Sequence, residues 1–215
     1  MGESPVEEKA ELIRLLMLLR RQGIQSPELL SAIELVPRHW FVDEEHLAEA
    51  YADLPLPFGD GEFLVKPSVL GFILQTLEIE PRQCVLEVGT GTGYQTSILS
   101  RLARRVFTIE RDGEMLREAR RRLEELTCRN VISLFADGSK GWPIHAPFDR
   151  IIVNAACLEV PGALADQLAS GGRLLLPRYV SSDEQQLVLV ERNGSSFDET
   201  ICLPVHFTPL REGLA

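Results

Sequence analysis

A glycine-rich turn after a short apolar segment is the part of this sequence whose residue types and spacing most clearly indicate chemistry. Positions 85–88 read V-L-E-V, and positions 89–93 read G-T-G-T-G. Glycine has no side chain to hinder a sharp bend or the close approach of a ligand, and a helix that follows offers unpaired N–H groups in its first turn. A buried strand, a glycine turn and a helix in this order are typical of a site for a nucleotide-like cofactor. The turn residues that we expect to bind it are Gly89, Thr90, Gly91 and Gly93.

The spacing of the glycines favours one kind of cofactor over another. A dinucleotide-binding turn reads G-x-G-x-x-G and would place its third glycine where this sequence has Tyr94. The observed G-x-G-x-G, with Glu87 two positions before its first glycine, resembles motif I of the S-adenosylmethionine-dependent methyltransferases. That resemblance implies that Glu87 lies beside the methionine end of the cofactor. An NAD-dependent oxidoreductase is the alternative on fold alone, and it would need a hydride-acceptor site for which we find no residues.

Carboxylates also end two later segments that favour strands. Glu110 ends the segment 105–110 and lies 21 residues after the first glycine of the turn, where doubly wound folds place the acid that accepts both ribose hydroxyls. Asp137 and Gly138 follow the segment 131–136, and we expect both to contact the cofactor. The methyltransferase resemblance implies that Asp137 accepts a hydrogen bond from the adenine amino group. The alternative interpretation is a glycine turn that binds no ligand. Three acids at one edge of a sheet make this alternative less favoured.

The rest of the sequence alternates segments that favour strands with segments that favour helices. This alternation predicts an α/β fold with a doubly wound, mostly parallel sheet of the Rossmann-like type, and its ligand crevice lies at the carboxyl ends of the strands. The expected strands cover residues 85–88, 105–110, 131–136, 148–154 and 171–177, with antiparallel strands over 185–210 around a turn at 192–194. The expected helices cover 6–22, 27–36, 67–77 and 161–170, and the proline- and glycine-containing segment 52–61 is expected to be a loop. We expect residues 1–80 to form a helical extension packed on a core of residues 81–215, in one compact domain overall.

The composition of the chain argues against several classes of partner. Its 215 residues, apolar fraction of 45% and formal net charge of −10 suit one globular domain and disfavour a nucleic-acid partner held by phosphate contacts. The arginines between Asp112 and Glu125 are interleaved with acids at helical spacing, so we expect them to form a solvated helix face. No uncharged apolar stretch is long enough to span a membrane, and the first residues lack the layout of a signal peptide. We therefore expect a cytoplasmic protein without a membrane partner.

The cysteines and histidines do not form a metal-binding pattern. The four cysteines are widely spaced and include no C-x-x-C pair, so we expect small core residues and neither a zinc site nor a redox motif. The four histidines are equally scattered. No metal is therefore expected. The cysteines are Cys84, Cys128, Cys157 and Cys202.

Several motifs outside the glycine turn are particular to one family. They are V-P-R at 36–38, A-Y-A-D at 50–53 and the G-x-G of residues 59–61. Further matching segments are R-Q-G-I at 21–24, A-P-F-D at 146–149, G-G-R-L at 171–174, and Val205, Phe207, Pro209 and Leu210. With these motifs the chain resembles the protein-L-isoaspartate O-methyltransferase family over nearly its whole length. The resemblance implies methyl transfer from S-adenosylmethionine to an isoaspartyl carboxylate in a damaged protein, by an enzyme that works as a monomer.

The loop that the resemblance assigns to the methyl acceptor departs from the family pattern. Where the family reads G-Q-G-Q-T-I-S-x-P, this chain reads G-D-G-E-F-L-V-K-P at 59–67. The serine regarded as the active-site hydroxyl is Val65 here, so the catalytic residue is unknown, and the threonine position is Phe63. Asp60 and Glu62 replace glutamines and would repel an incoming carboxylate unless a cation offsets them. The candidate substrate-loop residues are Asp60, Phe63, Val65 and Lys66.

This departure leaves three functions open. The first is isoaspartyl repair, slowed by the loss of a hydroxyl donor, and the second is a related methyltransferase with a different acceptor. The third is an S-adenosylmethionine-binding protein with little catalysis. A carboxyl group is ionised at neutral pH and needs no general base, so the lack of a catalytic histidine is no objection to the first. The loop backbone, or Ser68, is a possible substitute for the missing hydroxyl.

Overall fold

The computed structural model describes residues 5–59 and 61–215 of the chain, which divides into two compact units, residues 1–76 and 77–215. The first unit holds the helical extension and the substrate loop. The second holds the expected sheet. That residues 1–80 and 81–215 form one compact domain stays a prediction.

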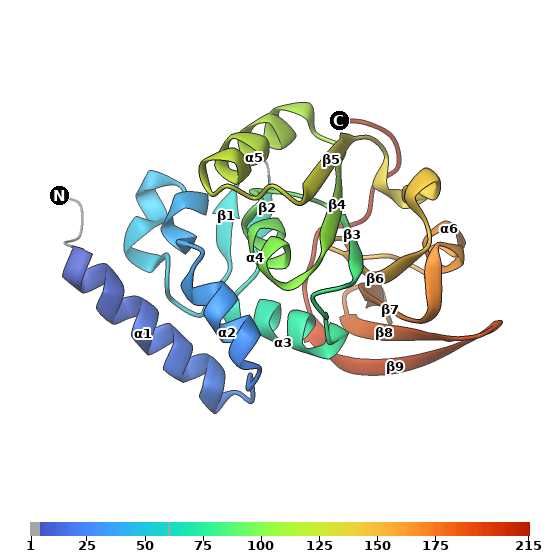
Figure 1. The fold of residues 1–215 in the computed structure, drawn as a ribbon, viewed down its shortest axis with the longest axis horizontal. Helices are drawn as coiled ribbons and strands as arrows, with labels where there is room; N and C mark the ends of the chain where they lie inside the picture. Colours follow the sequence, from blue (N-terminus) through green and yellow to red (C-terminus); the bar gives the residue numbers. More distant parts are fainter. Residues whose placement is uncertain (1–4, 60) are drawn as a thin grey trace. The chain divides into compact units, whose positions relative to one another are not determined.

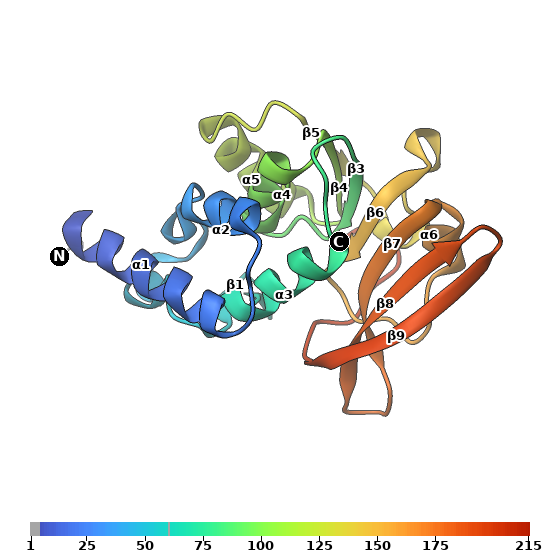
Figure 2. The ribbon, with the colours of Figure 1, turned by 60° about the horizontal axis from the view of Figure 1, so that its bottom comes forward.

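The sheet of the second unit has seven strands in the order β5-β4-β3-β6-β7-β8-β9. The strands are β3 (Cys84–Val88), β4 (Arg105–Glu110), β5 (Val131–Phe135), β6 (Phe148–Val153), β7 (Leu168–Tyr179), β8 (Gln185–Asn193) and β9 (Ser196–Val205). Strands β3 to β7 are parallel to one another, whereas β8 and β9 form an antiparallel pair along one edge (Figure 2). The chain order reverses between β3 and β6, which is where a doubly wound sheet opens a crevice at its carboxyl ends. The predicted fold class is therefore confirmed.

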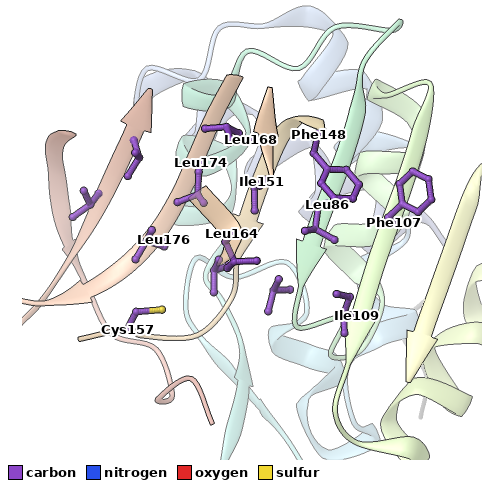
Figure 3. Packing of buried hydrophobic residues seen from close by; sticks show 14 residues of the cluster. Leu86, Phe107, Ile109, Phe148, Ile151, Cys157, Leu164, Leu168, Leu174 and Leu176 are labelled. Atoms are coloured by element: carbon purple, nitrogen blue, oxygen red, sulfur yellow. The ribbon is translucent and has the colours of Figure 1, made fainter. Parts of the chain in front are cut away.

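Helices cover both faces of this sheet, and the alternation of side chains along β3 decides what each face receives. Helices α4 (Tyr94–Leu102) and α5 (Gly113–Glu125) lie on one face, and the short α6 (Gly162–Asp166) lies on the other (Figure 1). Leu86 points into the buried cluster that includes Leu164 of α6 (Figure 3), and Val88 belongs to the same cluster. Successive strand residues point to opposite faces, so Glu87 points toward α4.

The connection from β6 to β7 differs from the prediction. The helix expected over 161–170 ends at Asp166, and the strand expected at 171–177 runs from Leu168 to Tyr179. Leu168 is fully buried and pairs with Phe148 of β6, so burial in the sheet takes this residue out of the helix. Strands β5 and β6 each end one residue earlier than expected.

The α-helices predicted for the first unit form, and 3-10 turns that the sequence did not predict lie between them. The α-helices are α1 (Pro5–Arg21), α2 (Pro27–Glu34), which ends two residues earlier than expected, and α3 (Pro67–Leu77), and the 3-10 turns are η1 (Arg38–Phe41) and η2 (Glu44–Glu49). The hydroxyl of Ser26 accepts a hydrogen bond from the N–H of Leu29, and Pro27 occupies the first turn, so α2 begins as the sequence indicates. Apolar residues of α1 and α2, such as Leu19 and Ile33, are buried.

The segment 52–61 is more regular than the predicted loop. Strand β1 (Leu56–Phe58) pairs antiparallel with β2 (Glu62–Leu64), so part of the expected loop is one arm of a hairpin. Leu56 and Leu64 are partners in this pairing and both are buried, which compensates for a proline within the strand. A two-stranded sheet leaves the free edge that proline tolerates.

The predictions for the arginines of α5 and for the four cysteines have different outcomes. In α5, Arg121 pairs with Glu118 and Glu125 on a solvated face, as predicted, whereas Arg122 is partly buried and donates to the carbonyl of Thr92. Cys157 is buried and Cys84 packs partly buried against the core, whereas the expectation of core residues is wrong for Cys128 and Cys202, which are partly exposed. Within the described residues, no helix is long and apolar enough to cross a membrane, and no group of three or more histidine, cysteine, aspartate and glutamate side chains is placed to hold a metal ion.

Candidate functional site

The turn after β3 has a backbone that only glycine adopts easily. Gly89 and Gly93 have φ angles of +90° and +87°, and Gly91 has a φ of +53°. A Cβ atom at Gly89 would lie 3.2 Å from the Cβ of Asn154, and one at Gly93 would lie 3.3 Å from the Cβ of Ala119. The turn is therefore a close-packed backbone cradle ahead of α4, and three of the four predicted turn residues are explained by their conformation.

Glu87, two residues before this turn, lies in a network of hydrogen bonds. Its carboxylate accepts the hydroxyls of Thr96 at 2.5 Å and Thr108 at 2.7 Å, and the amide of Gln95 at 2.9 Å. Burial raises the pKa of Glu87 to about 7, although these three hydrogen bonds oppose the rise. The side chain is fully buried, so within this unit it holds α4 and β4 against the turn.

Thr90 joins the same network, because its hydroxyl lies 2.7 Å from that of Thr108. The side chain of Thr90 is thus engaged within the protein, and its backbone is the part that can contact a ligand. The sequence interpretation missed the three partners of Glu87, which are polar residues at buried positions of a helix and a strand. Polar residues among the apolar residues of these two segments were the signal available for finding them.

Asn154, which follows β6, also escaped the sequence interpretation as a site residue. Its side-chain N–H donates to the carbonyl of Gly89 at 2.9 Å, and its side-chain oxygen accepts from Gln95 at 3.1 Å. Its backbone N–H donates to the carbonyl of Val88 at 2.8 Å. Asn154 thus fixes the turn at the point where the strand order reverses. The sequence signal for this role was that Asn154 ends the predicted fourth strand.

Glu110 is bonded directly to the glycine turn. One carboxylate oxygen accepts the N–H of Gly91 at 2.9 Å, and the other accepts the N–H groups of Arg111 at 2.8 Å and Asp112 at 3.1 Å. Glu110 is 6% exposed at the carboxyl end of β4. Its oxygens are therefore held in place by the backbone, and the oxygen that faces Gly91 keeps capacity for a hydroxyl donor.

Asp137 follows β5, next to Glu110 along the sheet edge. One of its carboxylate oxygens accepts the N–H and the hydroxyl of Ser139, at 3.0 and 2.7 Å, and the other accepts the N–H of Gly213 at 2.9 Å. Partial burial acts to raise the pKa of Asp137, but the hydrogen bonds from Gly213 and Ser139 outweigh it and leave the pKa below its ordinary value. Asp137 is thus an ionised acceptor.

Gly138 has a packing reason for being glycine. A Cβ atom there would lie 2.5 Å from a methyl carbon of Val88, so the chain after β5 approaches β3 closely. The structure thus brings the turn, Glu110 and Asp137 to one edge of the sheet. Hydroxyl and amino donors such as those of adenosine match this set of carboxyl acceptors, and the crowded turn leaves backbone as the surface for the rest of the ligand.

An open hollow of about 900 Å³ lies at the same carboxyl edge of the second unit. The loops after β6 and β7 and residues 209, 210 and 212 line it, and the two charged residues in its lining are the acids Glu159 and Glu212. Cys157 also lines it. Burial raises the pKa of the Cys157 thiol to about 11, so this group is protonated at neutral pH and is not a ready nucleophile.

The substrate loop lies in the first unit and is held at two points. The buried guanidinium of Arg38 donates to the carbonyl of Val65 at 3.0 Å. The carboxylate of Asp53 accepts the N–H of Ser68 at 2.8 Å, at the start of α3. Phe63, Val65 and Lys66 are partly exposed, whereas Ser68 is buried. The predicted residue Asp60 lies outside the described residues.

The sheet order, the glycine turn and the acids at the strand ends define the Rossmann-like class of methyltransferase fold. The model of the family described as protein-L-isoaspartate(D-aspartate) O-methyltransferase matches residues 8–215. A protein-L-isoaspartate O-methyltransferase of Parvibaculum lavamentivorans is 47% identical over 211 residues, covering 97% of this chain and 95% of its own. One of Rhodospirillum rubrum is 47% identical over 204 residues, covering 94% and 93%. The chain therefore belongs to the protein-L-isoaspartate O-methyltransferase family.

Solved structures agree with this assignment. A protein-L-isoaspartate O-methyltransferase with 27% identity superposes with a TM-score of 0.85 over 94% of this chain and 67% of its own. A Plasmodium falciparum protein described as a putative protein-L-isoaspartate O-methyltransferase, in complex with S-adenosyl-L-homocysteine, is 22% identical and shares the fold, with a TM-score of 0.80 over 92% of this chain and 97% of its own. The predicted family is confirmed.

Proposed function

We propose that this protein transfers a methyl group from S-adenosylmethionine to the carboxylate of L-isoaspartyl residues in damaged proteins, the first step of their repair. The observation that carries the proposal is the carboxylate of Glu110 bonded to the N–H of Gly91, because it ties a strand-end acid to the glycine turn. The family match over residues 8–215 supports the choice of reaction. Relatives at 42–47% identity carry the same enzyme name.

The strand-end acids and the glycine turn are the residues that would hold the cofactor. Glu110 would accept a ribose hydroxyl at the oxygen that faces Gly91, and Asp137, as the resemblance implies, would accept a hydrogen bond from the adenine amino group next to Gly138. The backbone of Gly89, Thr90, Gly91 and Gly93 would face the amino-acid portion. Glu87 would support the site through α4 and β4, because its carboxylate is already bonded to Gln95, Thr96 and Thr108.

The chemistry asks for alignment more than for acid or base catalysis. The cofactor supplies an electrophilic methyl group on a sulfonium, so that a carboxylate oxygen forms a bond to carbon while the carbon–sulfur bond breaks and its electron pair stays on sulfur. No proton is moved, because an isoaspartyl carboxyl is ionised at neutral pH. The protein's part is to orient the two reactants and to exclude water.

The reaction is tested by the initial rate of labelled methyl transfer to an isoaspartyl peptide. The matched control is the same peptide with a normal aspartyl residue. We expect transfer to the isoaspartyl peptide only. Cofactor binding without transfer to either peptide would instead favour a different acceptor or a binding protein, the readings that Val65 and Phe63 leave open.

Restoring a hydroxyl at position 65 should raise the activity. A hydrogen bond to a charged group is worth about 1.5–3 kcal/mol, so we expect Val65→Ser to increase kcat/KM for the isoaspartyl peptide at least about tenfold. Val65→Ala is the control, because it also shortens the side chain but adds no donor. Equal rates in the two variants would show that the hydroxyl is dispensable and that the loop backbone, held by Arg38, does the positioning.

The acidic hollow predicts a preference among substrates. Glu159 and Glu212 are its charged lining residues, so we propose that the peptide segment beside the isoaspartyl residue lies there and is favoured when basic. An isoaspartyl peptide with flanking lysines should have a KM several-fold below that of one with flanking glutamates, and the difference should shrink in high salt. Glu159→Gln should reduce the preference. A preference that this variant leaves intact would place the peptide elsewhere.

We also propose that the protein works as a monomer in the cytoplasm, with no nucleic-acid or membrane partner. The support is the family resemblance and the net charge of −10. Light scattering on the purified protein and fractionation of cells test the two statements. A dimer, or recovery with the membrane fraction, would contradict them.

A further inference from the structure

The last residues of the sequence run across the edge of the sheet where the candidate cofactor residues lie. The carbonyl of Thr208 accepts the N–H of Ala156 at 2.7 Å, and the N–H of Leu210 donates to the carbonyl of Ala156 at 2.8 Å. Farther along, the N–H of Gly213 donates to the Asp137 carboxylate at 2.9 Å. The N–H of Ala215 donates to the carbonyl of Arg111 at 3.0 Å. One segment thus contacts the chain that follows β6, β5 and β4 in turn, and its course can be followed in red in Figure 1.

We infer that residues 211–215 form a strap over the adenosine end of the cofactor site, and that this strap must open for S-adenosylmethionine to enter and for its product to leave. The inference rests on the proposed function. The strap is bonded to the carboxylate assigned to adenine and to the residue after Glu110, the carboxylate assigned to ribose. A ligand that reaches both carboxylates therefore meets the strap.

The strap is held weakly enough to move. All of its residues are exposed, so little apolar burial fixes it, and its two hydrogen bonds to the sheet edge come from the backbone. Segments with few buried contacts open at low free-energy cost. Asp137 can serve the strap and the cofactor together, because the oxygen that accepts Gly213 has a second lone pair. The closed strap is therefore compatible with bound cofactor.

A substitution at Gly213 can loosen the strap without changing any side chain assigned to the cofactor. It has a φ of +77°, and no atom lies within 4 Å of the Cβ that alanine would add. Gly213→Ala therefore strains the closed backbone without a clash. A non-glycine residue in a left-handed conformation costs about 1–2 kcal/mol, which corresponds to roughly a fivefold to thirtyfold larger open fraction.

The chain supplies a matched control in the turn between β8 and β9. Gly194 also has a positive φ, of +66°, and open space around the added Cβ, so Gly194→Ala carries a similar strain away from the strap. The experiment is stopped-flow measurement of S-adenosyl-L-homocysteine association and dissociation with the full chain. We expect both rate constants to rise about tenfold in Gly213→Ala, with the Kd changed less than threefold, and neither to change in Gly194→Ala.

Two outcomes would overturn the inference that the strap must open for the cofactor to enter and leave. Wild-type rates in Gly213→Ala would show that the segment does not stand in the path of the cofactor. A rise in dissociation alone would show that it holds the cofactor without barring entry. Failure of the proposed function is a separate result, because it would appear as no methyl transfer to the isoaspartyl peptide, whereas the strap is tested by the rates of S-adenosyl-L-homocysteine exchange.

Discussion

Replacing Glu110 with alanine is expected to weaken S-adenosylmethionine binding at least about tenfold. The oxygen that faces Gly91 has capacity for a ribose hydroxyl, and a hydrogen bond to a charged group is worth about 1.5–3 kcal/mol, which corresponds to about a tenfold to hundredfold change in Kd. The variant also loses the acceptor for the N–H of Gly91. Titration calorimetry measures the change in Kd directly.

A cofactor analogue separates the role of Glu110 in binding from its role in the turn. Wild-type protein should bind S-adenosyl-L-homocysteine more tightly than its 2′-deoxy analogue, and Glu110→Ala should bind both alike. Glu114→Ala is the surface control, because Glu114 is exposed and pairs with Arg117 on the solvated face of α5. If Glu110→Ala still discriminated between the two analogues, another group would have to hold the ribose.

The titration of Glu87 should lower the free energy of unfolding as the pH rises from 4.5 to 7. Its pKa is raised from 4.5 to about 7 by burial, so between these values the folded state keeps a proton that the unfolded state releases. The stabilising contribution is complete below pH 4.5 and is lost as the pH passes 7. At about 1.4 kcal/mol for each pH unit, the free energy of unfolding should fall by about 3 kcal/mol relative to Glu87→Gln, which has no carboxyl to titrate.

The measurement is denaturant unfolding of both proteins between pH 4.5 and 8. Their difference removes the titration of all other groups that the two share. Thr96→Val is a second test, because it removes the hydroxyl donor 2.5 Å from the carboxylate and should move the midpoint of the loss to higher pH. Parallel curves for wild type and Glu87→Gln would mean that Glu87 titrates alike in both states.

The sequence predicted the turn and the strands that position the site residues, because each of these elements is specified by residues close together in the sequence. Glycines at fixed spacing specify the turn after β3, and strand alternation places Glu110 at a strand end. The helix expected over 161–170 failed for the opposite reason, since the burial of Leu168 beside Phe148 depends on a strand that is distant in sequence. Likewise, the pairing of β1 with β2 is not encoded in the prolines that suggested a loop.

The supporting residues of the site had a sequence signal, but their partners could not be assigned from it. Gln95 and Thr96 are polar residues at buried positions of α4, and only the fold shows that both reach Glu87. The contact between Gly213 and Asp137 joins residues 76 positions apart, and no local pattern marks it. The strand-end acids themselves were predictable, because the order of a doubly wound sheet brings successive strand ends together.

The central claim is that this protein forms a methyl ester on an isoaspartyl carboxylate with S-adenosylmethionine as the donor. It is tested most directly by mass spectrometry of an isoaspartyl peptide after incubation with the protein and the cofactor. We predict that the peptide gains the mass of one methylene group on the isoaspartyl carboxyl, and that the aspartyl peptide gains none. An unmodified isoaspartyl peptide, under conditions where calorimetry shows the cofactor bound, would contradict the claim.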